Sequence, residues 1–227
     1  MTTLTTRPFT SRTALDTALA QRLSAALGAA GPSAVMLSGG TTPLPAYRAL
    51  GARVLPHDER LHILFSDERY VPSDSEASNY QRARPLLDAL ALPPQRLLRV
   101  RTELPLEQAA LQYEQALDAL LKAGIRITLG LLGLGADGHT ASLFSADDLA
   151  RTSGRLAIPV QRPDGMSGVS VTPGLLAQVE ALLFVVAGGG KHEALQALEA
   201  HAANLTAWRA VQDCARVELW VHEAVEA

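Results

Sequence analysis

Cysteine is almost absent from this sequence, since Cys214 is the only one among 227 residues. A single cysteine excludes both an internal disulfide and a metal cluster built on cysteine ligands. Its neighbours Asp213 and Ala215 provide nothing that would activate a thiol. We therefore expect Cys214 to be chemically inert.

Aromatic side chains and excess charge are also scarce. Aromatic residues make up 4% of the sequence and hydrophobic residues 48%, so a sizeable core must be built mainly from Leu, Ala and Val. The net charge of −3 provides no broad basic field. Nucleic acid is therefore not expected as a partner.

The sequence contains no apolar run long enough to cross a membrane, and its first residues lack a signal-peptide pattern. We therefore expect a soluble, cytoplasmic protein that does not bind membranes. The N-terminal segment Met1–Thr6 is polar and is expected to be frayed.

Short apolar runs alternate with helical patterns along most of the chain, which is typical of an α/β fold. Strands are predicted at 34–38, 61–65, 127–132, 182–186 and 217–221, and helices at 14–29, 43–50, 106–122 and 191–201, with another helix starting near 76 or 79. Two further short strands, 157–160 and 169–172, are expected to form an antiparallel pair. The pattern predicts a mostly parallel open sheet with helices on both faces, in a single domain spanning 1–227.

The segment Gly133-Leu134-Gly135-Ala136-Asp137-Gly138-His139 follows one of the predicted strands and is expected to lead into a helix. It places a histidine at the carboxyl end of a strand, where open α/β sheets have their ligand sites. Histidine is the side chain best suited to proton transfer near neutral pH. Asp137 either orients the ring or is a plain turn residue. Ser142, three residues after His139, is expected to pack within the helix.

Ser38-Gly39-Gly40-Thr41 follows another predicted strand and precedes a helix. Free N–H groups at a helix N-terminus favour an anion such as a phosphate. The alternative is an ordinary helix cap formed by Thr41 or Thr42. The turn matches neither of the common nucleotide-binding glycine motifs, so no nucleotide is implied.

Two cations also follow predicted strands. Lys191 comes after three glycines at a helix start, and Arg69 ends the charged run Asp67-Glu68-Arg69. The alternatives are a solvated surface lysine and a salt-bridged loop. Because the carboxyl ends of parallel strands share one edge, these side chains are expected to converge on one ligand. No other His, Cys or acidic residue has metal-ligand spacing to His139, so no metal site is expected. Water attack with histidine as the base needs no cofactor, so none is expected either.

Four motifs, in this order along nearly the whole chain, resemble those of 6-phosphogluconolactonases. They are Ser38-Gly39-Gly40-Thr41, Asp67-Glu68-Arg69-Tyr70-Val71-Pro72 with Ser78-Asn79-Tyr80, the stretch from Gly133 through His139 to Phe144, and Gly190-Lys191. The resemblance implies hydrolysis of 6-phosphoglucono-1,5-lactone in the oxidative pentose phosphate pathway. It also implies that His139 is the catalytic base and that Arg69 and Lys191 bind the substrate.

The sequence departs from the family at Gly168, where an arginine is usual, and at Thr206, where proline is usual. We predict that Arg162, in the glycine-containing loop upstream, replaces the missing arginine, because its long stem can reach a phosphate from a displaced position. The alternative is a solvated Arg162 and one phosphate contact fewer.

The expected catalytic residues are His139 and Asp137. The expected substrate contacts are Ser38, Gly39, Gly40, Thr41, Asp67, Arg69, Gly138, Arg162 and Lys191. The partner would be a sugar-phosphate lactone, bound by a monomer or weak homodimer. An isomerase or deaminase of the same fold and a non-catalytic sugar-phosphate sensor are the alternatives. Against them, the Asn-Glu pair typical of the deaminases is missing after His139, and we expect no DNA-binding module, since there is no room for one before Ala14 and no basic recognition helix.

Overall fold

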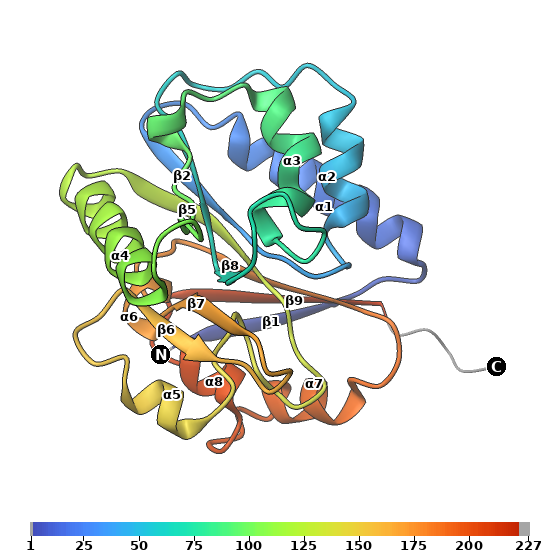
Figure 1. The fold of residues 1–227 in the computed structure, drawn as a ribbon. Helices are drawn as coiled ribbons and strands as arrows, with labels where there is room; N and C mark the ends of the chain where they lie inside the picture. The colour runs from blue at the N-terminus through green and yellow to red at the C-terminus, as the bar shows by residue number, and fades with distance from the viewer. Residues whose placement is uncertain (1, 223–227) are drawn as a thin grey trace.

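The computed structural model describes residues 2–222, and its main feature is a six-stranded sheet (Figure 1). The strand order is β1-β9-β8-β5-β2-β3, and every neighbouring pair is parallel. A second, antiparallel sheet has the order β4-β7-β6. The strands are β1 (Thr3–Pro8), β2 (Ser33–Leu37), β3 (Leu61–Phe65), β4 (Asp67–Arg69), β5 (Arg126–Leu132), β6 (Ala157–Gln161), β7 (Ser167–Val171), β8 (Leu182–Ala187) and β9 (Arg216–His222).

Helices cover both faces of the large sheet (Figure 1). One face carries α1 (Arg12–Leu27), α2 (Leu44–Gly51) and α3 (Asn79–Leu90). The other face carries α4 (Leu106–Lys122), α5 (Ala146–Ala150), α6 (Pro173–Leu176), α7 (His192–Glu199) and α8 (Thr206–Val211). The predicted fold class is therefore confirmed, and the antiparallel pair is extended to three strands.

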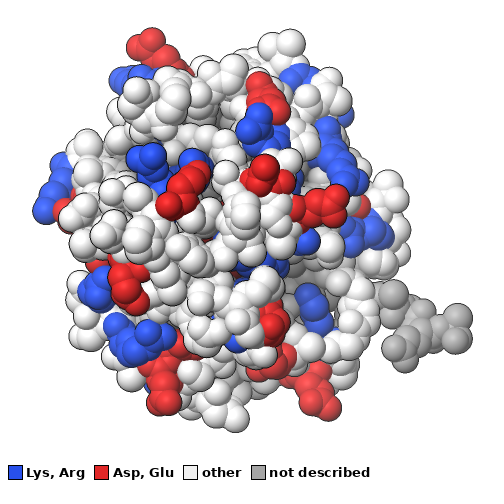
Figure 2. Space-filling view, viewed as in Figure 1, with Lys and Arg blue, Asp and Glu red and all other residues white. Residues whose placement is uncertain are grey.

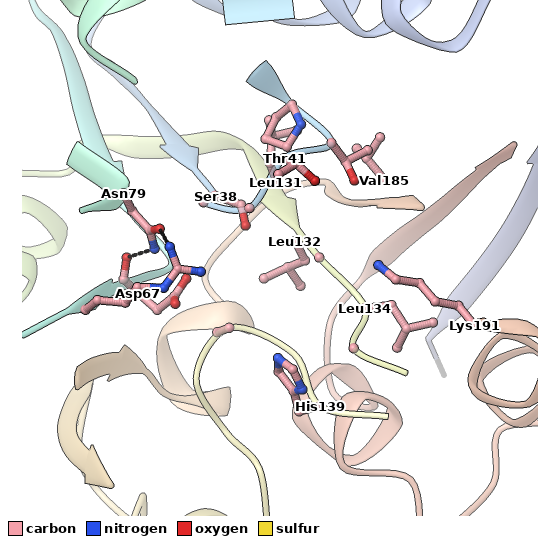
Figure 3. A pocket seen from close by; sticks show the side chains of 18 of the residues that line it. Ser38, Thr41, Asp67, Asn79, Leu131, Leu132, Leu134, His139, Val185 and Lys191 are labelled. Atoms are coloured by element: carbon pink, nitrogen blue, oxygen red, sulfur yellow. Dashed lines mark hydrogen bonds between the residues drawn. The ribbon is translucent and has the colours of Figure 1, made fainter. Parts of the chain in front are cut away.

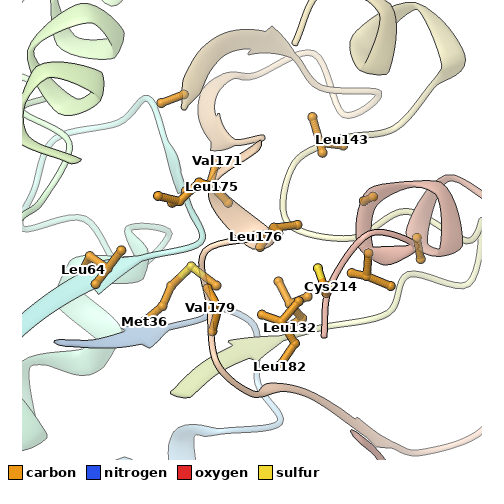
Figure 4. Packing of buried hydrophobic residues seen from close by; sticks show 14 of the residues in the cluster. Met36, Leu64, Leu132, Leu143, Val171, Leu175, Leu176, Val179, Leu182 and Cys214 are labelled. Carbon is orange, nitrogen blue, oxygen red and sulfur yellow. The ribbon is translucent and has the colours of Figure 1, made fainter. Parts of the chain in front are cut away.

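The strands separate two hydrophobic cores, as β2 illustrates. Ala34 and Met36 point into one core, and Val35 and Leu37 point into the other. All four are fully buried, as expected for a parallel strand with helices on both sides. Cys214 lies among aliphatic residues of the first core (Figure 4), and burial raises the pKa of its thiol to about 12.

The direction of strand addition reverses between β2 and β5. From β2 the chain adds β3 on one side, whereas from β5 it adds β8 on the other side. Loops that leave two such strands diverge and leave a crevice at the carboxyl ends of the strands. The crevice lies between the segments that follow Leu37 and Leu132.

Two sequence predictions about local structure were wrong. Thr3–Pro8 is not frayed but forms edge strand β1, paired in parallel with β9; Met1 lies outside the described residues. The side chains are mostly exposed, so the strand depends on backbone pairing and looks polar in sequence. The charged run Asp67–Arg69 forms strand β4, paired with β7, so the alternative of a salt-bridged loop is wrong.

The segment after His139 is also not a helix. Ala141 has a φ of +50°, a left-handed conformation that a right-handed helix cannot include. A bridge between Thr140 and Leu143 follows, and α5 begins only at Ala146. Ser142 is therefore presented by an irregular loop rather than by a helix.

Basic and acidic side chains are interspersed over the face seen in Figure 2, in keeping with the small net charge. None of the helices in residues 2–222 is long and apolar enough to cross a bilayer.

Candidate active site

A pocket with a volume of about 230 Å³ occupies the crevice between β2 and β5. Its lining comes from the segment after β2, from β4, from the segment after β5, and from the starts of α3 and α7. In Figure 3, Asp67 and Asn79 lie on one side of this pocket and Lys191 on the other, with His139 between them. The polar lining residues are Ser38, Thr41, Thr42, Asp67, Arg69, Asn79, His139, Arg162 and Lys191.

The segment after β2 brings backbone to the pocket wall. The buried Tyr47 hydroxyl donates to the carbonyl of Ser38 at 2.8 Å and accepts from its N–H at 3.3 Å, which fixes the end of the strand. Gly40 has a φ of +82°, in the left-handed region that favours glycine. Helix α2 starts with no side-chain cap, so the capping alternative for Thr41 and Thr42 is wrong.

His139 and Asp137 form a close pair at the mouth of this pocket. The imidazole Nδ1 lies 2.5 Å from the Asp137 carboxylate, which also accepts the backbone N–H of His139. Desolvation opposes ionisation of Asp137, but the hydrogen bonds from His139 outweigh it and lower the pKa of the carboxyl. Asp137 is therefore ionised at neutral pH.

This pairing fixes the imidazole tautomer. An ionised carboxylate can only accept a hydrogen bond, so Nδ1 must carry the proton. In a neutral imidazole, Nε2 is then left with a free lone pair. His139 lines the pocket, and the Phe144 ring packs beside it with a centroid separation of 4.4 Å. The ring is held in the form in which it can accept a proton from a molecule in the pocket.

Gly135 makes this arrangement possible. A Cβ atom at Gly135 would lie 2.1 Å from Nδ1 of His139 and 2.4 Å from the carboxylate of Asp137. We therefore expect Gly135→Ala to separate the pair and to lower kcat about a hundredfold, the lower end of the range for positioned acid–base catalysis. Steady-state kinetics of this variant and its control would measure this. Gly133→Ala is the matched control, since a Cβ there meets no atom within 4 Å. An equal loss in both variants would contradict the explanation.

Arg69 reaches the pocket from β4, and Asn79 holds it there. The guanidinium Nη1 donates to the Asn79 side-chain oxygen at 3.0 Å and to the Ala77 carbonyl at 2.8 Å. The Asn79 amide nitrogen donates to the Asp67 carbonyl at 2.9 Å. Burial lowers the pKa of Arg69, as does the nearby Arg162, while Asp67 opposes the shift. The two arginines therefore lie close enough to repel each other.

Lys191 lies at the start of α7, after the glycine turn, and extends toward the middle of the pocket (Figure 3). Burial lowers the pKa of its ammonium. No hydrogen bond or ion pair joins it to any residue in the described part of the chain. A half-buried cation without a counter-charge is costly, and a bound anion would offset that cost.

Arg162 lines the same pocket from the turn between β6 and β7. Its side chain is 10% exposed, and its Cδ would lie 3.5 Å from a Cβ placed at Gly168. That Cβ would also lie 2.9 Å from the Glu68 carbonyl, too close for this backbone. The Arg162 side chain therefore lies next to Gly168, in space that a larger side chain at position 168 would occupy.

Most of the predicted contact residues meet in this pocket, but Gly138 does not line it. A Cβ at Gly138 would collide with Leu205. The Gly138 carbonyl accepts a hydrogen bond from the backbone N–H of Ala207, so Gly138 faces α8 instead.

Asn79 lines the pocket but was missed as a site residue. Ser142, expected to pack within a helix, instead forms hydrogen bonds with Asp67 and Arg162. Both lie within recognisable motifs, but their contacts depend on α3, β4 and the β6–β7 turn, which come from other parts of the chain.

Fold and pocket define an α/β protein whose site combines a histidine–carboxylate pair with several cations. The chain belongs to the family of glucosamine-6-phosphate isomerases and 6-phosphogluconolactonases, whose model matches residues 10–220.

Curated relatives support this membership. The 6-phosphogluconolactonase of Synechocystis sp. is 38% identical over 180 residues, covering 77% of this chain and 74% of the relative. The 6-phosphogluconolactonase of Nostoc sp. is 36% identical over 199 residues, covering 85% of this chain and 78% of the relative. The crystal structure of 6-phosphogluconolactonase from Thermotoga maritima superimposes with a TM-score of 0.79 at 26% identity, covering 97% of this chain and 100% of that one.

Proposed function

We propose that this protein hydrolyses 6-phosphoglucono-1,5-lactone to 6-phosphogluconate, in the oxidative pentose phosphate pathway. The observation that carries the proposal is the His139–Asp137 pair, which shares one pocket with Arg69, Arg162 and Lys191. A base and several cations that line the same pocket match a substrate that has a reactive carbonyl and a phosphoryl group. The relatives named as 6-phosphogluconolactonases agree with this assignment.

His139 acts as a general base in this proposal. A water molecule attacks C1 of the lactone while Nε2 of His139 takes its proton, and the charge on the carbonyl oxygen grows. Asp137 stabilises the resulting imidazolium through Nδ1. The C1–O5 bond then breaks, and the imidazolium returns a proton to the departing ring oxygen. Backbone N–H groups of the glycine loop are candidates for stabilising the oxyanion.

The phosphoryl group would be held by the cations that line the pocket. Lys191 supplies a point charge, whereas Arg69 and Arg162 supply planar guanidinium groups that suit phosphate oxygens. The backbone of Ser38, Gly39, Gly40 and Thr41 and the N-terminus of α2 add favourable dipoles. Asp67 lies beside Arg69, and its carboxylate would accept a hydrogen bond from a sugar hydroxyl of the substrate. A cytoplasmic location and a monomer or weak homodimer stay predictions.

Turnover assays on purified protein test the proposal. We expect fast hydrolysis of freshly prepared 6-phosphoglucono-1,5-lactone above its spontaneous rate, followed as acid release. Glucosamine 6-phosphate and ribose 5-phosphate are the comparison substrates, assayed for ammonia release and for ketose formation. Turnover of either comparison substrate in place of the lactone would overturn the assignment. Binding of sugar phosphates without turnover would favour a sensor.

A further inference from the structure

A short chain of hydrogen bonds joins the buried Asp67 to Arg162 through Ser142. The Ser142 hydroxyl donates to Oδ2 of Asp67 at 2.8 Å, and Nη1 of Arg162 donates to the same hydroxyl at 2.8 Å. Ser142 is completely buried. The three residues come from β4, from the loop after His139 and from the β6–β7 turn, so the chain ties three segments of the pocket together.

The direction of these hydrogen bonds follows from the chemistry of the two ends. A guanidinium has only donors, and an ionised carboxylate has only acceptors. The hydroxyl between them must therefore accept from Arg162 and donate to Asp67. Neither partner can reverse its role, so the Ser142 hydroxyl holds one orientation.

Ser142 is also the inner attachment of the Arg162 side chain. Nε and Nη2 of Arg162 both lie 3.1 Å from Oδ2 of Asp164, whose side chain is 41% exposed. The guanidinium carbon lies 5.1 Å from the centroid of the Phe144 ring. The ion pair with Asp164 lies at the exposed turn, whereas the hydrogen bond to Ser142 lies in the interior.

The guanidinium retains free donors for a ligand. Arginine has five N–H groups, and the contacts with Asp164 and Ser142 use three of them. The remaining two, one on each terminal nitrogen, have no partner in residues 2–222. Arg162 lines the pocket, and its guanidinium is held at both ends.

We propose that Ser142 is a positioning residue that fixes Arg162 for the phosphoryl group of the substrate. This inference rests on the proposed lactonase function and adds a residue to it. Without the hydroxyl, Arg162 keeps its exposed ion pair with Asp164 and loses the attachment that holds it at the pocket. Holding a long side chain in place before binding reduces the entropy that the ligand must overcome.

Kinetics with two substrates test this role. We expect Ser142→Ala to raise KM for 6-phosphoglucono-1,5-lactone about threefold to tenfold, the range of one ordinary hydrogen bond, because Ser142 acts on the ligand only through Arg162. KM for unphosphorylated glucono-1,5-lactone should not change, and kcat for both should stay within about twofold. Retained turnover of the unphosphorylated lactone also shows that the variant is folded. Equal changes for both lactones would overturn the proposal.

Ser66→Ala is the matched control. The Ser66 hydroxyl is equally buried and donates to the other carboxylate oxygen of Asp67 at 2.8 Å, but it does not contact Arg162. If Ser142 acts through Arg162, the ratio of the two KM values changes in Ser142→Ala alone. If it acts only by orienting Asp67, both variants raise KM for both lactones and leave the ratio unchanged, and the proposal is wrong.

A double-mutant cycle gives the strictest test. In an Arg162→Ala background, Ser142→Ala should add no further increase in KM, because the residue it positions is gone. Independent, multiplicative effects would contradict the proposal. If Ser142→Ala does not fold, Ser142→Cys serves instead, since its thiol has nearly the same shape but bonds weakly.

Calorimetry separates this inference from the proposed function. Binding of 6-phosphogluconate and of gluconate to wild type and Ser142→Ala requires no turnover. A selective loss of 6-phosphogluconate affinity supports the role of Ser142 even if lactone hydrolysis fails. Unchanged affinity for 6-phosphogluconate overturns it even if hydrolysis is confirmed.

Discussion

Replacement of His139 by asparagine is expected to lower kcat for 6-phosphoglucono-1,5-lactone by about 10²–10⁴-fold, the range for a positioned general base. KM should change little, because the asparagine amide can still donate to Asp137 while the cations that line the pocket are untouched. The loss should therefore fall on the chemical step. Initial rates at pH 7, corrected for spontaneous hydrolysis, would measure it.

His62→Asn is the control for the loss of a histidine. His62 lies in β3, with its ring bonded to the Arg60 carbonyl, and it does not line the pocket. The kcat of the His62→Asn variant should match that of the wild type. A His139→Asn variant with wild-type kcat would show that the base has been assigned to the wrong residue.

Local sequence patterns were sufficient to predict most of the fold. The leucines of α1 recur along one helical stripe, and α4 spans the predicted residues 106–122. The central strands β2, β5 and β8 of the large sheet are largely apolar runs because both faces are buried. These signals lie within each segment. Strand β1 escaped prediction because its pairing with β9 involves residues more than 200 positions apart in the sequence.

The residues of the candidate site also fall into two groups, those visible in local sequence patterns and those that depend on tertiary packing. The glycine motifs and their attached His139 and Lys191 were visible in sequence because strand ends converge in any parallel sheet. The Arg162–Ser142–Asp67 chain was not visible, because it depends on how the small sheet packs over the pocket. The side chain of Arg162 passes next to Gly168 of β7, where a larger side chain would meet it. A local sequence pattern does not show which residues of different segments lie next to each other.

Replacement of Lys191 by alanine is expected to raise KM for the phosphorylated lactone about tenfold to a hundredfold, which corresponds to one charge-assisted contact. Lys191 has no partner in the described part of the chain, so its removal disrupts no internal interaction. KM for unphosphorylated glucono-1,5-lactone should remain at the wild-type value. Equal losses on both substrates would place Lys191 at the reacting carbonyl instead of the phosphoryl group.

The pH dependence of product binding gives an independent test of the same lysine. Burial lowers the Lys191 pKa in the free protein, so its charge is lost at a lower pH than the charge of an exposed lysine. Affinity for 6-phosphogluconate, measured by calorimetry, should therefore fall as pH rises through this lowered pKa. In Lys191→Arg the charge persists to higher pH, and the fall should disappear. An unchanged profile in Lys191→Arg would show that another group causes the loss of affinity.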